Sequence, residues 1–344
     1  AAAQGIKTDN SKILMGIDLA EQKIAKIQRK LNGERLAYRL DIDLPPSISD
    51  RVNRAAYGVL SSSSAPTNTQ RDAYKIASSD FQPLEKELNS FIDNDMKRII
   101  DKIFSYQTNL NTVKNKFLEI KKNTKVKILF DLLNQYNEKS QIRYVGGCVR
   151  KILNNEEVDD IDLATNIIPE ELIHILKKNK INYFDVGISH GTITAILEKK
   201  NFEITTLRKD ILTDGRHAKV EFSDSWIEDA SRRDFTINSI YADMNGNFFD
   251  PFNGKMDLEN GNVKFIGNPD KRLKEDYLRI LRYIRFYINY SKTEHDQATK
   301  KSIRQNISGV SLISRERLLQ ELKKLILSKN FIKIEKDEFL KEIL

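Results

Sequence analysis

The stretch from Arg143 to Thr165, RYVGGCVRKILNNEEVDDIDLAT, decides how this chain of 344 residues is interpreted. Its periodicity changes at a pair of glycines. Residues 142–145 form a short apolar run typical of a strand, whereas the apolar residues of 149–153 follow at helical spacing. This order predicts a strand, a turn at Gly146-Gly147 and a helix.

A glycine turn of this kind can bind phosphate. Glycine lets the backbone approach a ligand closely, and the free N–H groups of the following helix attract an anion. A nucleoside triphosphate would then rest at Gly146 and Gly147 with Arg150 beside it. Taken by itself, the glycine pair is also compatible with an ordinary turn.

Two carboxylates alternate with apolar residues thirteen residues after Gly147, in Asp160-Ile161-Asp162-Leu163. Residues two apart on a strand share a face, so both acids point one way and the apolar residues enter the core. Like charges held together are costly unless a cation joins them, and oxygen ligands suit Mg²⁺. The alternative is an exposed acidic strand edge. The position directly after the glycine turn favours a magnesium site.

The two patterns together resemble the signature of the class II tRNA nucleotidyltransferases, the CCA-adding enzymes and their bacterial poly(A) polymerase relatives. The family pattern is GGxVRD, a short spacer and DxDxxT. This chain matches it except that Lys151 stands where the family usually has Asp. The departure lies outside the carboxylate pair and concerns the local helix contacts more than the chemistry.

The resemblance implies an α+β fold for about residues 111–344. A polymerase-β-like head at 111–245, with a small mixed sheet and helices, would precede an all-α neck at 246–344. That neck would include the start of an RNA-binding body and lack the longer helical body and tail of the family. In Phe202-Glu203-Ile204, Glu203 matches the position of a third catalytic carboxylate in some members. The alternative is a strand-edge glutamate facing solvent.

A second motif, SRRDFTIN at 231–238, matches the family's RRDFTxN. Arg233, Asp234 and Asn238 offer a guanidinium to phosphates and oxygens to ribose hydroxyls. A surface salt bridge is the ordinary explanation of such a cluster. Its spacing after the first motif favours nucleotide binding instead.

A third motif lies in residues 274–286, KEDYLRILRYIRF, which are predicted to be one helix. Asp276 and Arg279 are three apart and would be neighbours on one helix face. In the family the matching EDxxR pair selects the base without a nucleic-acid template, so the resemblance implies this role here, with Arg282 in support. Out of context, an ordinary salt bridge is the commoner explanation.

Between these motifs, the polar segment 207–219 is predicted to be a mobile loop, and the resemblance places that loop beside the active site. Phe249-Asp250-Pro251-Phe252-Asn253-Gly254 is predicted to be a turn in which Asp250 binds backbone N–H groups at the passage from sheet to neck. Ser314 is a plausible N-cap of a helix that ends near Leu327.

Composition excludes several classes of protein. Apolar runs are short and charged residues make up 31%, so no membrane span is expected and a cytoplasmic protein is predicted. A single cysteine, Cys148, leaves no disulfide partner within the chain. The net charge is +8, most of it in residues 111–344. This fits a polyanionic partner such as RNA, although excess lysine is often only a matter of solubility.

Residues 1–110 are predicted to form a separate helical segment, a hairpin or bundle without a catalytic constellation. Residues 1–105, through the stretch SSSSAPTNTQRDAYKIASSDFQPLEKELNSFIDNDMKRI, are similar to the helical C-terminal part of some BNR-repeat, sortilin-like proteins. A natural fusion and a chimeric reading frame are both compatible with this resemblance.

The sequence therefore predicts an Mg²⁺-dependent enzyme that adds CMP and AMP from CTP and ATP to the 3′ end of tRNA. Its rivals are a poly(A) polymerase of the same superfamily and a non-catalytic RNA-interaction fragment. The predicted residues are Asp160, Asp162 and Glu203 for catalysis, of which Asp160 and Asp162 hold the metal. Those predicted to bind the nucleotide are Gly146, Gly147, Arg150, Arg233, Asp234, Asn238, Asp276, Arg279 and Arg282.

Overall fold

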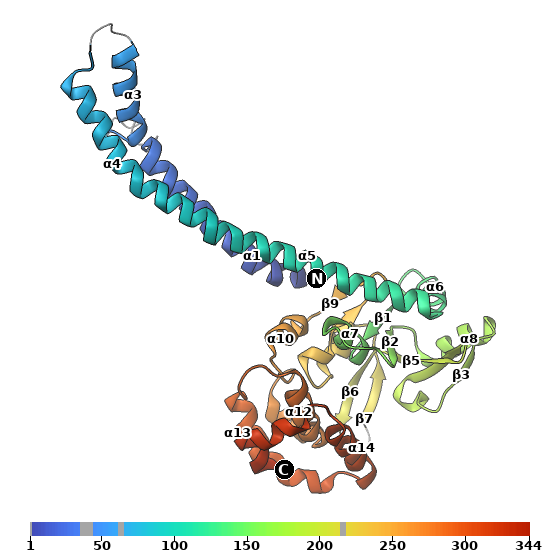
Figure 1. The fold of residues 1–344 in the computed structure, drawn as a ribbon. Coiled ribbons are helices and arrows are strands. Elements are labelled where there is room, and N and C mark those ends of the chain that lie inside the picture. Colours follow the sequence, from blue (N-terminus) through green and yellow to red (C-terminus); the bar gives the residue numbers. More distant parts are fainter. Residues whose placement is uncertain (1, 35–43, 61–64, 214–217) are drawn as a thin grey trace. The chain divides into compact units, whose positions relative to one another are not determined.

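A computed structural model describes residues 2–34, 44–60, 65–213 and 218–344. The chain divides into two compact units, one of residues 7–109 and one of residues 110–344 together with the first six residues. Figure 1 gives the order of the elements along the chain. Each unit is described by itself.

The N-terminal unit is built from helices, as the sequence predicts. They are α1 (Ala2–Asn32), α3 (Ile48–Leu60), α4 (Asn68–Ser90), a π-helical turn (Phe91–Met96) and the first part of α5 (Lys97–Asn123). The start of α4 is fixed by a capping box, in which the backbone N–H of Gln70 donates to the Thr67 hydroxyl and the Gln70 side chain accepts from the Thr67 N–H at 2.8 Å. Lys30 of α1 pairs with Glu87 of α4, so the helices form a hairpin. Its core of buried residues is small: Ile27, Ile48, Ala77 and Leu84.

The second unit contains a mixed sheet of seven strands in the order β3-β4-β5-β2-β1-β8-β9. The strands are β1 (Ile142–Val145), β2 (Ile161–Thr165), β3 (Asn182–Phe184), β4 (Thr192–Leu197), β5 (Lys200–Thr206), β8 (Tyr241–Ala242) and β9 (Phe248–Phe249). The pairing of β2 with β5 is parallel, and the other pairings are antiparallel. The predicted small mixed sheet is therefore confirmed.

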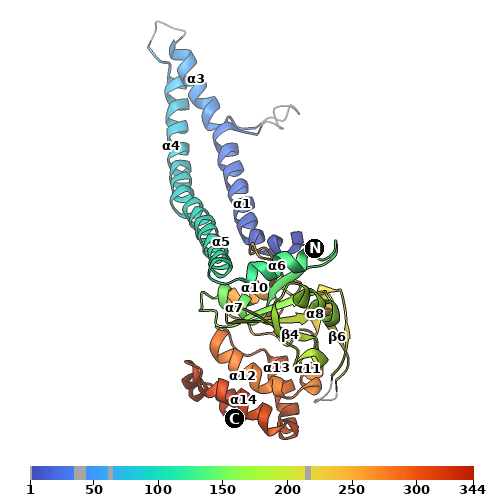
Figure 2. The same cartoon turned by 90° about the vertical axis from the view of Figure 1, so that its right-hand side faces the viewer.

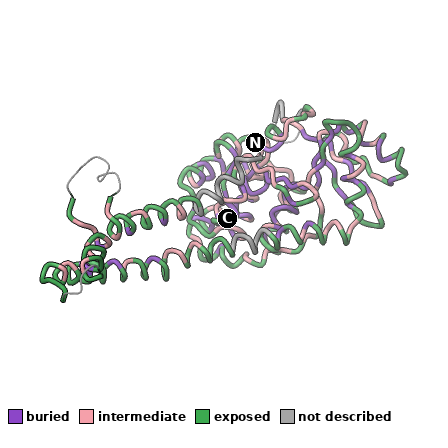
Figure 3. The backbone as a smooth tube through the Cα atoms, turned by 90° about the horizontal axis from the view of Figure 1, so that it is seen from above, coloured by how far each residue is buried: buried purple, intermediate pink, exposed green. Residues whose placement is uncertain are grey.

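Helices cover one face of this sheet and bury its apolar residues (Figure 2). They are α6 (Val126–Asn134), α7 (Gly147–Leu153), α8 (Pro169–Lys178) and the end of α5. Leu163 and Ile204 point into this core and are fully buried, because side chains alternate along a strand. Figure 3 shows the buried segments as purple stretches of the backbone.

The mobile loop predicted for residues 207–219 is wrong for the part of it that the structure describes. The backbone forms two antiparallel strands, β6 (Arg208–Thr213) and β7 (Ala218–Phe222), with a register irregularity between Asp210 and Leu212. Residues 214–217 lie outside the described residues. The β-branched Ile211, Thr213 and Val220 favour extended backbone, and the polar composition of the segment concealed this signal.

Helix α9 (Trp226–Ser231) lies between β7 and β8 along the chain. Helices follow the last strand, as predicted for the neck. They are α10 (Gly254–Asn260), α11 (Pro269–Glu275), α12 (Leu278–Tyr290), α13 (Gln297–Asn306), α14 (Arg315–Ile326) and α15 (Glu338–Ile343). A second core joins α12 to α14 and α15 through Ile284, Leu325 and Leu340. Ser314 lies at the N-cap of α14, without the side-chain bond expected of a cap.

Asp250 accepts hydrogen bonds from the backbone N–H groups of Gly254 and Lys255, both at 2.8 Å, between β9 and α10, which confirms the predicted turn. None of the described helices is long and apolar enough to cross a membrane.

Candidate active site

The glycine turn lies between β1 and α7, as predicted. Gly146 has φ +66° and ψ −119°, a backbone conformation that favours glycine, and its carbonyl accepts from the Arg150 N–H at 3.0 Å. A Cβ added to Gly146 would lie 3.4 Å from Nη1 of Arg233 and 3.7 Å from the backbone oxygen of Asn238. The fold thus brings the first two motifs together.

The carboxylates lie beside the same turn. Asp162 is on β2, Asp160 directly precedes this strand, and the fully buried Leu163 points to the opposite face. A Cβ added to Gly147 would lie 3.5 Å from Oδ2 of Asp162. The alternative of an acidic strand edge is wrong for Asp162, because β2 lies between β1 and β5.

Glu203 of β5 lies directly opposite Asp162 in the parallel ladder, so the two residues share a face of the sheet. β5 lies between β4 and β2, which excludes a position on an edge strand. The Glu203 side chain is nevertheless exposed.

The pKa of Asp162 is raised above its ordinary value. Burial is the main cause, and the charges of Glu203 and Asp160 add to it, while Arg233 and Arg150 oppose the shift. The two arginines therefore do not fully compensate the negative charge of an ionised Asp162. A hard divalent cation held by carboxylate oxygens would supply the missing positive charge. Asp160 and Asp162 fit such a cation. Within the described residues no three His, Cys, Asp or Glu side chains are close enough to hold a metal together, so Glu203 does not complete a three-residue ligand set.

Asp229 of α9, which the sequence analysis did not single out, organises the arginines of the second motif. Its side chain is 1% exposed. Oδ1 accepts from Nη2 of Arg232 at 2.6 Å, and Oδ2 accepts from Nη2 of Arg233 at 3.0 Å and from the Tyr241 hydroxyl at 2.6 Å. Burial acts to raise the pKa of Asp229, but the two guanidinium groups outweigh it and hold this pKa well below its ordinary range.

A signal for Asp229 was present in the sequence. It lies three residues before Arg232 and four before Arg233, at the spacing of neighbours on a helix. The motif at 231–238 does not include this acid.

The other polar residues of the second motif are buried. Asp234 is 8% exposed, and its carboxylate accepts from Nδ2 of Asn238 at 3.0 Å and from Nη2 of Arg282 at 2.5 Å. Asn238 also accepts a hydrogen bond from Arg150, which is 7% exposed. These contacts join the first two motifs to α12. They also place Arg150 behind the glycine turn, where its guanidinium is hydrogen-bonded to Asn238.

The single helix predicted for residues 274–286 is wrong. α11 ends at Glu275, α12 begins at Leu278, and Asp276 between them is extended, with φ −158° and ψ 105°. Asp276 and Arg279 therefore do not share a helix face. Asp276 accepts from the Leu278 N–H at 3.1 Å and pairs with Arg317 of α14 at 2.6 Å.

Arg279 has a different partner. Its Nη1 lies 2.5 Å from Oε2 of Glu275, which also pairs with Arg272 at 2.6 Å. Asp276 and Arg279 also do not form the salt bridge with each other that was the alternative to base reading, since each has another partner. Both residues stay candidates for base reading, and each forms a salt bridge with a different residue.

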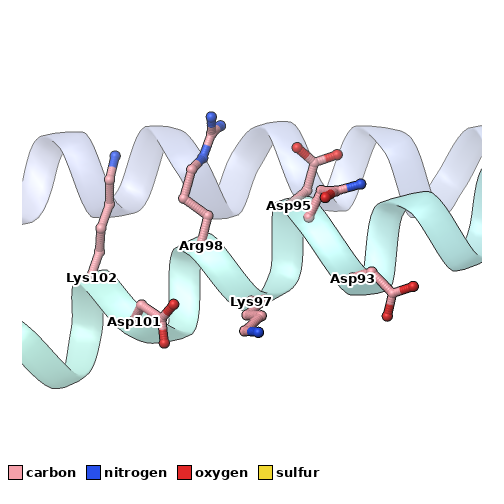
Figure 4. A pocket seen from close by; sticks show the side chains of 7 residues that line it. Asp93, Asp95, Lys97, Arg98, Asp101 and Lys102 are labelled. Carbon is pink, nitrogen blue, oxygen red and sulfur yellow. The ribbon is translucent and has the colours of Figure 1, made fainter.

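Two cavities of about 590 Å³ each lie among the described residues. One is lined by Asp160 together with Lys116 and Lys200, next to the predicted metal site. The other is lined by charged residues of the π-helical turn and α5, and there Asp95, Arg98 and Lys102 point one way while Asp93, Lys97 and Asp101 point another (Figure 4). No convergent set of groups forms in this second cavity, so it is not a candidate site.

Comparison with known protein families identifies two regions of the chain. Residues 142–264 match the poly A polymerase head domain, and residues 295–335 match a probable RNA- and SrmB-binding site of polymerase A. The first match includes the glycine turn, the carboxylates and the arginine motif. These matches support the resemblance of residues 142–264 to the head of a class II tRNA nucleotidyltransferase.

Individual proteins are similar to this chain over about half of its length. The human mitochondrial CCA tRNA nucleotidyltransferase 1 is 47% identical over 192 residues, which are 55% of this chain and 44% of the relative. A CCA-adding enzyme of Staphylococcus epidermidis is 36% identical over 54% of this chain and 46% of the relative. The chain thus spans less than half the length of these relatives. The family is generally metal-dependent.

A solved structure shares the fold. The crystal structure of the Bacillus stearothermophilus CCA-adding enzyme in complex with CTP is 32% identical, with a TM-score of 0.51, and covers 57% of this chain and 46% of that chain. The predicted nucleotidyltransferase head followed by helices is confirmed. Because one relative is mitochondrial, the predicted cytoplasmic location stays a prediction.

Proposed function

We propose that this protein adds CMP and AMP from CTP and ATP to the 3′ end of tRNA without a nucleic-acid template. One observation carries the proposal: the carboxylate of Asp162 lies directly beside the glycine turn, 3.5 Å from where a Cβ of Gly147 would be. A nucleotide whose phosphates rest on this turn would present its α-phosphate to the carboxylates. The names of the similar proteins support the choice of substrates.

The chemistry is transfer of a nucleotidyl group. The 3′-hydroxyl of tRNA gives up its proton to solvent and its oxygen attacks the α-phosphorus. The bond between the α-phosphorus and the oxygen of the β-phosphate breaks, and pyrophosphate leaves. Asp160 and Asp162 would hold Mg²⁺, which lowers the pKa of that hydroxyl and stabilises the leaving group. Glu203, opposite Asp162, would complete the negative charge around the reacting hydroxyl.

The remaining residues bind and orient the nucleotide. Gly146, Gly147 and Arg233 would contact its phosphates, and Asp229 holds the guanidinium of Arg233 in place for this. Asp234 and Asn238 would hold the ribose.

Asp276 and Arg279 would read the base, with Arg282 in support. They do not share a helix face: Arg279 of α12 pairs with Glu275 of α11, and Asp276 pairs with Arg317 of α14. The base would have to compete with Arg317 for the carboxylate of Asp276.

We also propose the division of the chain inferred from its sequence, with a helical segment at 1–110, the head at 111–245, and at 246–344 a neck and the start of an RNA-binding body. The match of residues 295–335 to a probable RNA-binding site supports the assignment of the last part.

The test is an incubation of the full chain with tRNA that ends before CCA, in MgCl₂, with CTP, ATP, both or neither. Addition of two C residues and one A, only when both nucleotides are present, is the expected result. A chain that uses ATP alone and extends it repeatedly is a poly(A) polymerase, the candidate favoured by the name of the matching head domain. No transfer with any nucleotide would contradict both functions and leave a non-catalytic RNA-interaction fragment.

A further inference from the structure

Arg150 occupies a position that differs from the one expected of a phosphate ligand. Its side chain is 7% exposed, Nη1 donates to Oδ1 of Asn238, and Nε is buried without a hydrogen-bond partner. A guanidinium so enclosed is costly unless other groups compensate it. Its surroundings therefore indicate what this arginine does.

Two aromatic rings of α12 provide that compensation. The guanidinium carbon lies 4.7 Å from the ring centre of Phe286 and 4.9 Å from that of Tyr290. A desolvated guanidinium over aromatic rings is attracted to their negative faces. Because Arg150 is on α7, one turn after Gly147, these contacts join the glycine turn to α12.

The rings lie on the functional face of α12. Phe286 and Tyr290 follow Arg279 by seven and eleven residues, and Arg282 follows it by three, so all four share one side of the helix. The side that carries the predicted base-reading arginine is thus the side on which Arg150 rests.

The contacts close into a circuit. Arg150 bonds to Asn238, Asn238 bonds to Asp234 at 3.0 Å, and Asp234 pairs with Arg282 at 2.5 Å. Arg282 and Phe286 are on the same helix, and the ring of Phe286 returns to Arg150. A closed circuit permits less relative movement of α7 and α12 than one contact does.

We propose that Arg150 is a positioning residue that sets the spacing between the phosphate-binding turn and the base-reading face of α12, and thereby takes part in nucleotide selection. This inference rests on the proposed function. A nucleotide held at its phosphates presents its base at a fixed distance, so a shift of α12 relative to the turn misplaces the base contacts.

Two matched pairs of variants test the inference. Arg150→Lys keeps the charge and loses the planar group that faces both rings, and Lys151→Met is its control on the same helix, because Lys151 pairs outward with Asp159 at 2.7 Å. Tyr290→Leu removes one ring, and Tyr290→Phe is its control, because it removes only the hydroxyl that bonds Glu156 at 3.3 Å. Tyr290 is only partly buried, so Tyr290→Leu decides the matter even if Arg150→Lys fails to fold.

The measurements are KM and kcat for CTP and ATP, the ratio of correct to UTP incorporation, and the equilibrium affinity for CTP and UTP. Arg150→Lys and Tyr290→Leu should each raise the nucleotide KM and lower the selectivity by roughly tenfold, while both controls match the wild type. Folded variants with wild-type KM and selectivity would overturn the inference. If the wild type binds CTP without transferring it, the proposed function fails and the affinity ratio still decides the role of Arg150. If the wild type binds no nucleotide, both are wrong.

Discussion

At the scale of single residues, Asp162 lies among like charges. Burial, Glu203 and Asp160 raise its pKa, and Arg233 and Arg150 offset this only in part. Since its folded-state pKa exceeds the ordinary value of 3.8, the ionised carboxylate is less favourable in the folded protein than in the unfolded chain. The group therefore destabilises the metal-free protein at neutral pH.

Asp162→Asn should consequently raise the melting temperature of metal-free protein at pH 7 and abolish transfer. The gain should shrink as the pH falls through the folded-state pKa toward 3.8, because the wild-type carboxyl becomes protonated there. Thermal melts in chelator across this range, together with transfer assays in MgCl₂, measure both effects.

Asp159→Asn is the control for this prediction. Asp159 is exposed and its pKa is lowered by Lys151, so its loss should not raise the melting temperature. A lower melting temperature for Asp162→Asn at pH 7, or undiminished transfer, would contradict the account of this site.

Short-range patterns made part of the site predictable. Alternation alone placed Asp160 and Asp162 on one face, and the structure has Leu163 buried on the other. The role of Asp229 could not be read in the same way, because it depends on a hydrogen bond from Tyr241 of β8 and on the depth to which the carboxylate is buried. Burial of Arg150 likewise depends on a helix far along the sequence.

At the scale of elements, the interruption between α11 and α12 is the main departure from the sequence-based expectation. Apolar periodicity in residues 274–286 continues across the break, so it predicted one helix. Extended backbone at Asp276 instead lets its carboxylate accept from the N–H of Leu278 and reach Arg317. Tertiary contacts with α14 stabilise this extended conformation, and a local sequence pattern cannot predict contacts with a distant helix.

Asp276→Ala tests that arrangement. It removes the acceptor for the Leu278 N–H, which should cost about 1 kcal/mol of unfolding free energy, the usual net contribution of one hydrogen bond. It should also reduce discrimination against UTP and GTP by roughly 5- to 150-fold, the range for lost base-edge contacts. Urea unfolding and incorporation ratios for the four nucleotides measure the two effects.

Asp276→Asn separates the two contributions. Its side-chain oxygen can still accept from Leu278, so it should be more stable than the alanine variant although its charge is lost. If both variants unfold alike, the hydrogen bond from the Leu278 N–H does not stabilise the fold. If Asp276→Ala keeps wild-type selectivity, Asp276 does not read the base.

At the scale of the whole molecule, the net charge of +8 should govern association with RNA. Binding of tRNA should weaken steadily with added salt, with log affinity falling linearly against log salt, because lysines and arginines release counterions from the phosphates. Fluorescence anisotropy over a series of KCl concentrations measures this slope. A double-stranded DNA of similar length, titrated alongside, distinguishes general attraction to a polyanion from preference for tRNA, and salt-independent binding would contradict the prediction.

The general architecture was accessible from the sequence because strands, helices and motifs appear in order along the chain. The N-terminal helices and the mixed sheet agree with the expectation, while β6 and β7 were missed because polar composition resembled that of a loop. The order of the strands in the sheet required the structure, since β5 lies next to β2 although β3 and β4 come between them in sequence.

The circuit through Arg150 also bears on the order in which the protein is made. Arg150 and Asn238 are 88 residues apart, and the rings that complete their surroundings come later still, at Phe286 and Tyr290. Synthesis proceeds from the N-terminus, and such distant contacts form only after the intervening chain has emerged. A nascent chain that has released β1 to β5 contains the strands on which Asp162 and Glu203 lie opposite each other, but not yet α12, whose rings face Arg150. During translation the segments that carry the carboxylates therefore leave the ribosome before the segment that would choose a nucleotide.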